Sequence, residues 1–192
     1  MTADPDDGEL IARSLDGDAD AFVEVVRRHE ATVGAYLARR VGRGPAEDLL
    51  GDVWVAALGS RASYDRSFSD AGPWLLGVAH NTLRRHWRSR PNEEPVADVT
   101  GMASGWDPWA AVDDRVNVES VLRQALALLR PQQREILTLV AWEDLTVAEA
   151  GRAIGIPPGT ARRYLHEARM ALRNAPGMAA LLADQNTVKE AN

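Results

Sequence analysis

The apolar residues of this chain recur at helical spacing almost throughout, and this periodicity limits the possible folds more than any other feature. Residues 20–37 follow the i, i+3, i+4, i+7 pattern of an amphipathic helix. The same spacing returns in 46–58, where Leu58 is predicted to face inward, and in 73–83, 115–129 and 131–140. No run alternates apolar and polar residues for long enough to predict a strand. The chain is therefore predicted to be all-α.

Charge and composition divide the helical pattern into segments. The chain has 192 residues and a net charge of −6, which taken globally argues against nucleic-acid binding. However, the acidity is concentrated at the N-terminus and in a stretch with three prolines and only acidic charge, the composition of a linker. The two blocks between and after these are mildly basic. We predict an acidic tail (1–19), a helical domain (20–90), an acidic linker (91–114), a second helical domain (115–175) and a C-terminal tail (176–192).

Several classes of protein are excluded by what the sequence lacks. There is no cysteine, so disulfides and thiolate metal sites are ruled out. Apolar runs reach about five residues, as in 179–183, against the roughly 18 that span a membrane. The acidic N-terminus does not resemble a signal peptide, and a soluble, cytoplasmic chain is expected. With no phosphate-binding glycine loop, paired-histidine motif or nucleophile–base set, we predict no enzyme, metal or cofactor.

Residues 145–173 carry the most informative local pattern, that of a helix-turn-helix. Thr146 and Glu149 have capping-box spacing, and Gly155 stands where a left-handed turn residue would end the first helix. The second helix would expose a polar, basic face. Its residues are Thr160, Arg162, Arg163, His166, Arg169 and Arg173. Such a helix fits the major groove of DNA; the alternative is an ordinary helical hairpin with a solvated face.

A second basic face is predicted on the helix that begins near Pro73. Its polar side would present His80, Asn81, Arg84, Arg85 and Arg88, with Arg90 past the end. One interpretation is that the helix dipole simply favours cations at this C-terminus. The other is a nucleic-acid surface, on which Trp87 could stack. We assign Trp54 and Trp74 to core packing.

Together and in this order, the two helical blocks resemble the sigma-70 family of bacterial RNA polymerase sigma factors, in particular its extracytoplasmic-function (ECF) group. The first block is similar to region 2, in DADAFVEVVRRHEATVGAYLARRV, PAEDLLGDVWVAAL and PWLLGVAHNTLRRHWRSR. The second is similar to region 4, in ALALLRPQQREILTLVAWEDLTVAEAGRAIGIPPGTARRYLHEARMALR. The resemblance covers about residues 10–90 and 117–175.

The resemblance implies a promoter-specificity subunit without chemistry of its own. It would bind core RNA polymerase, recognise the −35 and −10 promoter elements and promote DNA melting, while the polymerase forms the bonds. An alternative is a sigma-like helix-turn-helix regulator that binds promoters without supporting initiation. An anti-sigma factor is a further partner expected at family level, and no membrane insertion is implied.

The resemblance also implies roles for residues of the first block. The surface that binds the β′ clamp helices of the core polymerase would be Glu47, Asp48, Leu49 and Asp52. Beside it, Gly51 replaces the usual glutamine and should weaken the helix by about 1 kcal/mol. The loop 64–72 would form the pocket for a base flipped from the non-template strand of the −10 element. The −10 contacts would come from Asn81, Arg84, Arg85, Trp87 and Arg88.

In the second block, the resemblance implies that region 4 contacts the polymerase β flap and reads the −35 element. The reading residues would be Thr160, Arg162, Arg163, His166 and Arg169. Three positions of this domain carry smaller side chains than is usual in the family: Ala150, Gly151 and Ala161. We predict that they reduce the apolar volume of its core. The linker acids would imitate a nucleic-acid backbone inside the polymerase, or serve as a soluble spacer. These acids are Glu93, Glu94, Asp98, Asp107, Asp113 and Asp114.

Overall fold

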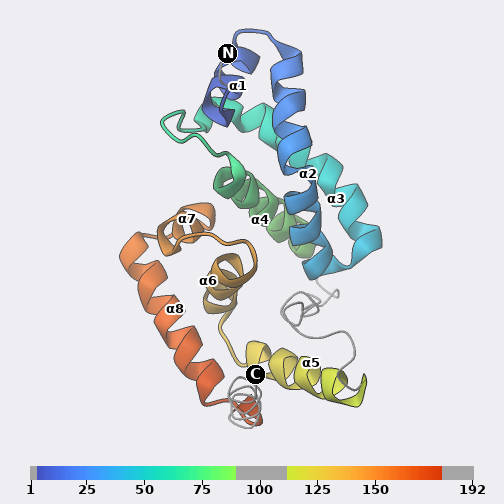
Figure 1. Ribbon diagram of the computed structural model, residues 1–192, viewed down its shortest axis with the longest axis vertical. Helices are drawn as coiled ribbons and strands as arrows, with labels where there is room; N and C mark the ends of the chain where they lie inside the picture. The colour runs from blue at the N-terminus through green and yellow to red at the C-terminus, as the bar shows by residue number, and fades with distance from the viewer. Residues whose placement is uncertain (1–3, 90–111, 179–192) are drawn as a thin grey trace, which may run out of the picture. The chain divides into compact units, whose positions relative to one another are not determined.

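The computed structural model describes residues 4–89 and 112–178. Of residues 112–119 it describes the backbone only. Every regular element in these ranges is a helix and none is a strand (Figure 1), which confirms the all-α prediction. The helices are α1 (Asp7–Leu15), α2 (Ala19–Val41), α3 (Arg43–Ser60), the short 3-10 helix η1 (Arg61–Ser63), α4 (Gly72–Ser89), α5 (Val112–Ala127), α6 (Pro131–Trp142), α7 (Val147–Ala153) and α8 (Pro158–Arg173).

The described residues divide into two compact units. The first contains everything up to Ser89 together with Glu149–Ile156, which includes most of α7. The second contains the remaining described residues, with α5, α6 and α8.

Helix α2 is central to the first unit and packs against α1, α3 and α4. Its buried side chains follow the predicted helical spacing, and α3 and α4 contribute further apolar residues to the same core. Completely or almost completely buried are Val25, Val33, Tyr36, Leu37, Val53, Leu75 and Leu83. Helices α3 and α4 carry side chains that the sequence predicts as interfaces, so this core sets their orientation.

Part of the segment expected to be an acidic tail is a folded helix. In α1, residues 7–15, the N-cap Asp6 accepts the backbone N–H of Glu9 at 2.8 Å, which satisfies a donor at the helix start. Leu10 and Ile11 are buried, at 2% and 0% exposure. Helix α1 packs on α2 and thus belongs to the first unit.

The connection between α2 and α3 is tighter than the sequence predicted. Residues 42–45 were expected to form a loop, but α3 already begins at Arg43. Gly42 alone makes the turn, with a φ of 79° that glycine adopts without steric cost. Pro45 fits within the first turn of α3 because the backbone N–H that proline lacks would have no intrahelical acceptor there.

In the second unit, α6 packs against α8. A hydrogen bond of 2.7 Å from Gln133 Nε2 on α6 to Glu167 Oε2 on α8 joins the two helices. The backbone N–H of Arg130 donates to Gln133 Oε1 at 3.1 Å, which holds the same side chain in place. The core of this unit includes Leu126, Ile136, Leu139, Ala161, Leu165 and Ala168. Helix α8 is therefore held in place through the side that packs against α6.

The turn before α8 has the geometry that the sequence predicted. Gly155 has a φ of 73°, in the left-handed region, which confirms its predicted conformation. The backbone N–H of Ile156 donates to the Gly151 carbonyl at 2.9 Å, and this bond closes the end of α7. Pro158 then opens α8, where a proline costs no hydrogen bond.

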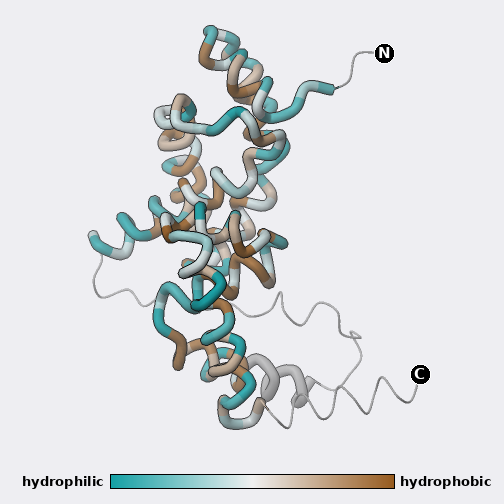
Figure 2. The backbone as a smooth tube through the Cα atoms, turned by 90° about the vertical axis from the view of Figure 1, so that its left-hand side faces the viewer, coloured by the Kyte–Doolittle hydropathy of each residue, from teal (hydrophilic) through white to brown (hydrophobic). Residues whose placement is uncertain are grey.

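Several predictions concern residues outside the described ranges. These are the linker as far as residue 111, with Trp106, Trp109, Glu93, Glu94, Asp98 and Asp107, and the C-terminal residues after Met178. Helix α5 begins at Val112, three residues before the predicted start at 115. Among the described helices, none is long and apolar enough to span a membrane. Figure 2 shows hydrophilic and hydrophobic residues interspersed along them.

Candidate nucleic-acid interface

Helix α4 presents the basic face predicted to contact the −10 element. Asn81, Arg84, Arg85 and Arg88 are all exposed, and their spacing of three, four and seven residues places them on one side of the helix. The guanidinium of Arg85 donates to Thr82 Oγ1 at 3.2 Å, and Arg88 Nε donates to the Arg84 carbonyl at 3.2 Å. These contacts stay within the helix and leave the arginines at the surface, where phosphates could reach them. Trp87 is half-buried.

A hollow of the first unit is lined by the loop after η1, the start of α4 and part of α7. Its lining includes Tyr64, Phe68, Trp74 and Asn81. The rings of Tyr64 and Trp74 are in contact, with centroids 5.3 Å apart and planes inclined by 56°. The structure therefore brings the predicted −10 residue Asn81 together with the predicted pocket loop. Trp74, assigned to the core from the sequence, lines this hollow and is only half-buried.

The lining of the hollow combines polar and aromatic side chains. Tyr64 Oη donates to the Phe68 carbonyl at 2.7 Å. Burial, together with the nearby carboxylates of Asp7 and Asp70, raises the pKa of Tyr64 to about 12, so its hydroxyl remains a donor. The pKa of Asp65 is lowered by hydrogen bonds from the Ser67 side chain and backbone. Such a lining offers flat faces for stacking and acceptor oxygens for the amino groups of a base.

Helix α3 carries the acidic residues predicted to bind the core polymerase. Glu47, Asp48 and Asp52 are exposed, so their carboxylates are available to a partner. Leu49, predicted in the same set, is 5% exposed and faces the core of the first unit instead. The structure thus brings the three acids to the surface without Leu49.

Two apolar residues of α3 are exposed, and sequence reasoning missed both. Val55 is 74% exposed and lies three residues after Asp52 and seven after Asp48, on the same side of the helix. Leu58, predicted to face inward, is 43% exposed; that prediction was wrong. The helical spacing from Asp48 and Asp52 was the signal that could have identified Val55.

Helix α8 exposes the side predicted to read the −35 element. Arg162, Arg163, His166 and Arg169 are exposed, and Thr160 in the first turn is partly exposed. The opposite side is buried through Ala161, Leu165 and Ala168.

Arg163 has two neighbours along the helix. Its guanidinium carbon lies 5.2 Å from the centre of the Tyr164 ring, and its Nε lies 3.9 Å from Glu167 Oε1. Both neighbours hold the side chain loosely, so it can rearrange toward DNA.

The chain matches two family models, and together they cover both helical blocks. Residues 25–92 match the model described as Sigma-70 region 2, which covers most of α2, all of α3 and all of α4. Residues 120–172 match Sigma-70, region 4, which covers the second half of α5, all of α6 and α7 and most of α8.

Comparison with curated proteins and solved structures agrees with these matches. The chain is 34% identical to the RNA polymerase sigma factor CarQ of Myxococcus xanthus, over 86% of this chain and 94% of CarQ. It is 32% identical to the ECF RNA polymerase sigma factor BldN of Streptomyces coelicolor, over 83% of this chain but only 62% of BldN.

The fold is similar to that of the sigma factor RpoE in the structure of its complex with the anti-sigma factor NepR from Bartonella quintana. The TM-score is 0.57, with 20% sequence identity, over 79% of this chain and 94% of RpoE. At this identity the comparison shows the fold alone. The family models and the curated relatives show that the chain belongs to the ECF group of sigma-70 family sigma factors, which bind core RNA polymerase and promoter DNA in transcription initiation.

Proposed function

We propose that the hollow at the start of α4 captures a base of the −10 element, while the arginines farther along α4 hold the adjoining backbone. The observation that supports this most is that Asn81 lines the same hollow as Tyr64 and Trp74. Removing a base from its stack costs a few kcal/mol. Stacking on aromatic side chains and a hydrogen bond from an amide can return that free energy.

On this proposal the arginines of α4 supply position and affinity, and the hollow supplies selectivity. Arg84, Arg85 and Arg88 are exposed on the side of α4 that also carries Asn81. Contacts from guanidinium groups to phosphates fix the register of a nucleic-acid strand without reading its bases. Their contribution should therefore weaken with added salt, whereas base selectivity should persist.

We also propose α3 as the docking surface for the polymerase and α8 as the −35 reading helix. On α3 the exposed carboxylates of Asp48 and Asp52 lie beside the exposed Val55. This combination of charge and apolar surface is what a specific partner helix can bury. On α8 the exposed basic face is opposite a buried apolar one, so the helix can enter the major groove without losing its packing.

The remaining expectations form part of the same proposal. The chain would act in the cytoplasm without catalytic activity, as two modules, 20–90 and 115–175, joined by the acidic linker and with α1 added to the first. The structure of RpoE with its anti-sigma factor supports the proposal that an anti-sigma factor binds this chain as well.

The test of base capture is run-off transcription with core polymerase, combined with binding to a single-stranded −10 oligonucleotide of the transcribed promoter. Asn81→Ala should weaken binding of the holoenzyme to the oligonucleotide and slow open-complex formation, with little effect on duplex binding. Thr32→Ala, at an exposed position of α2, is the matched control. Equal loss of duplex and single-strand binding would refute base capture. No transcript, despite tight promoter binding by the chain alone, would favour a regulator that does not support initiation.

The docking surface has a separate test. Asp48→Arg reverses an exposed charge on α3 and should reduce the amount of core polymerase retained by the immobilised chain. Glu30→Arg makes the same charge change at an exposed position of α2 and should leave retention unchanged. If both variants retain core polymerase like the unmodified chain, α3 is not the docking surface.

A further inference from the structure

Helix α1 lies directly against the loop that lines the hollow. The backbone N–H of Asp7 donates to the Ser69 carbonyl at 3.1 Å. The backbone N–H of Ala71 donates in return to Asp7 Oδ2 at 2.9 Å. A Cβ on Gly8 would lie 2.9 Å from the Arg66 carbonyl oxygen, so only glycine allows so close an approach. The backbone of the loop therefore packs directly against the first turn of α1.

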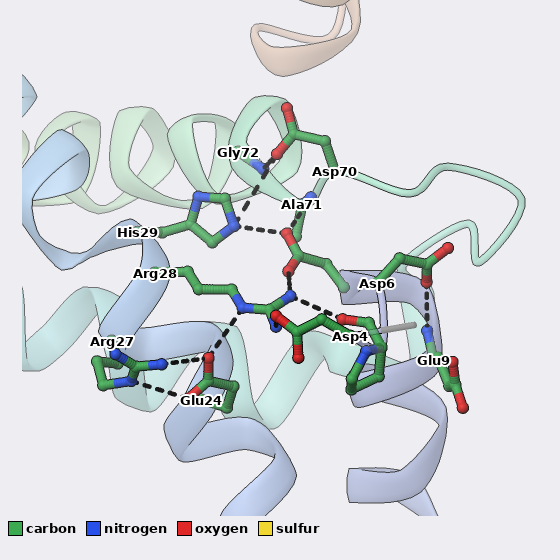
Figure 3. Close-up of polar contacts among 12 residues, drawn as sticks. Asp4, Asp6, Glu9, Glu24, Arg27, Arg28, His29, Asp70, Ala71 and Gly72 are labelled. Carbon is green, nitrogen blue, oxygen red and sulfur yellow. Dashed lines mark hydrogen bonds and ion pairs between the residues drawn. The ribbon is translucent and has the colours of Figure 1, made fainter. Parts of the chain in front are cut away.

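The carboxylate of Asp7 is the centre of this contact. Figure 3 labels its partners Arg28, His29 and Ala71. Asp7 is only 4% exposed. Besides Ala71, its Oδ2 pairs with His29 Nε2 at 2.5 Å, and its Oδ1 accepts Arg28 Nη1 at 3.2 Å. Burial alone would raise the pKa of Asp7, but the hydrogen bonds from His29 and from the Ala71 backbone lower it below the ordinary value. The carboxylate is thus charged and connects α1 and α2 to the loop.

The same cluster also includes the residues of the loop that lead directly into α4. Asp70 Oδ1 accepts the backbone N–H of Gly72 at 2.8 Å, at the start of α4. The same oxygen lies 3.9 Å from His29 Nε2. His29 therefore lies between a carboxylate of α1 and a carboxylate of the loop. Between Tyr64 and Ala71 the loop residues are exposed; local hydrogen bonds such as Tyr64 Oη to the Phe68 carbonyl hold its first part, and this cluster attaches its last part to α1 and α2.

A metal ion is the other possible function of this cluster, since atoms of Asp7, His29 and Asp70 lie within 4.8 Å of one another. The hydrogen bonds argue against it. Backbone N–H groups already donate to both carboxylates. The guanidinium of Arg28, a full positive charge, lies 3.2 Å from Asp7 Oδ1 and would repel a cation. The cluster is better described as a hydrogen-bonded clasp.

We propose that Asp7, through His29 and the backbone of Ala71, is a positioning residue for −10 recognition, because it holds the loop in the shape in which Tyr64 and Phe68 line the hollow. This inference rests on the proposed capture of a base in that hollow. It makes α1, outside the residues that match the region 2 model, part of the promoter-reading surface.

The test measures base discrimination by the holoenzyme. Four single-stranded −10 oligonucleotides that differ only at the captured base are bound in parallel, and the ratio of their affinities is recorded. Asp7→Ala should reduce the affinity for the preferred oligonucleotide about tenfold and bring the four affinities closer together. Retention of core polymerase should be unchanged. Asp4→Asn is the control, because Asp4 also pairs with Arg28, at 3.1 Å, while the carboxylate that binds the described loop residues is that of Asp7.

Each outcome decides between the two proposals. If Asp7→Ala leaves the ratio unchanged while Asn81→Ala collapses it, base capture stands and the positioning role of Asp7 is wrong. If neither variant changes the ratio, base capture itself is wrong and the positioning role falls with it. If Asp7→Ala does not fold, Asp7→Asn replaces it, since it keeps the size and one acceptor oxygen. A purely structural role would lower the melting temperature of this variant without changing the ratio.

Discussion

Asn81, Arg84, Arg85 and Arg88 lie on the exposed side of α4, where helical periodicity alone had predicted them. Trp74 does not follow that rule: predicted to be in the core, it contacts the ring of Tyr64 and lines the hollow instead. Sequence patterns identify the sides of a helix. They do not encode which distant segment covers a given side.

Arg163 provides a residue-scale test of how α8 contacts DNA. If it reads a guanine in the major groove, Arg163→Ala should cost about 1–3 kcal/mol at the preferred −35 sequence and relax specificity at one position. Its contacts with Tyr164 and Glu167 are long, so the fold should tolerate the change. The measurement is holoenzyme binding to a set of duplexes with single −35 substitutions.

The matched control for this test is Arg123→Ala, at an exposed position of α5. It removes the same charge from the same unit but not from the reading face. A loss with Arg163→Ala that is equal for all duplexes would reassign that side chain to a phosphate.

At the scale of elements, the sequence patterns predicted the long helices but not α1. The segment that contains α1 is rich in acids, and its composition predicted a tail. The N-cap pair of Asp6 and Glu9 was the signal that could have found it. A nine-residue helix is marginal in isolation, so α1 depends on the burial of Leu10 and Ile11 against the first unit. Such tertiary stabilisation leaves little trace in a short sequence window.

Two helical glycines should respond in opposite ways to the same substitution. Gly51 is exposed within α3, and a Cβ there would meet nothing within 4 Å. Gly51→Ala should therefore raise the free energy of unfolding by about 0.5–1 kcal/mol. Gly8→Ala should lower it, because a Cβ would lie 2.9 Å from the Arg66 carbonyl oxygen and 3.0 Å from that of Phe68.

Urea unfolding of the full chain measures both substitutions, with Gly44→Ala as a further comparison, since its Cβ would also meet nothing within 4 Å. If Gly8→Ala and Gly51→Ala change the free energy of unfolding by similar amounts in the same direction, the loop can move away from α1 at little cost.

At the scale of the whole molecule, the net charge of −6 is a poor guide to function because it sums unlike parts. Acids predominate in the first twenty residues and in the linker, and the basic side chains of α4 and α8 are exposed elsewhere. The structure adds that some N-terminal acids are paired within the first unit. Asp18 accepts Arg13 Nη2 at 2.7 Å, and Asp7 accepts Arg28. Part of the N-terminal negative charge is thus paired with arginines of the first unit.

The effect of the N-terminal acids on DNA binding is better tested by substitution than by deletion, because deletion of the N-terminal residues would also remove α1. Glu9, Asp16 and Asp20 are exposed. Replacing them with Gln, Asn and Asn should strengthen binding of the free chain to duplex DNA several-fold at low salt, because electrostatic repulsion is reduced. Fluorescence anisotropy at two salt concentrations measures this, and the gain should disappear at high salt.

The charge-retaining replacements Glu9→Asp, Asp16→Glu and Asp20→Glu are the matched control. If the neutralised and the control variants bind duplex DNA equally at low salt, these acids do not influence the free chain.

The bond between Asp7 and Ala71 joins residues 64 positions apart, and this separation makes one backbone amide informative. The helices of the first unit can form from local contacts, but this bond closes only when α1 docks on the loop. Deuterium exchange at the Ala71 amide therefore reports how often α1 undocks, independently of global unfolding. Compared between the free chain and the holoenzyme, its protection would reveal whether polymerase binding stiffens the loop before any promoter is met.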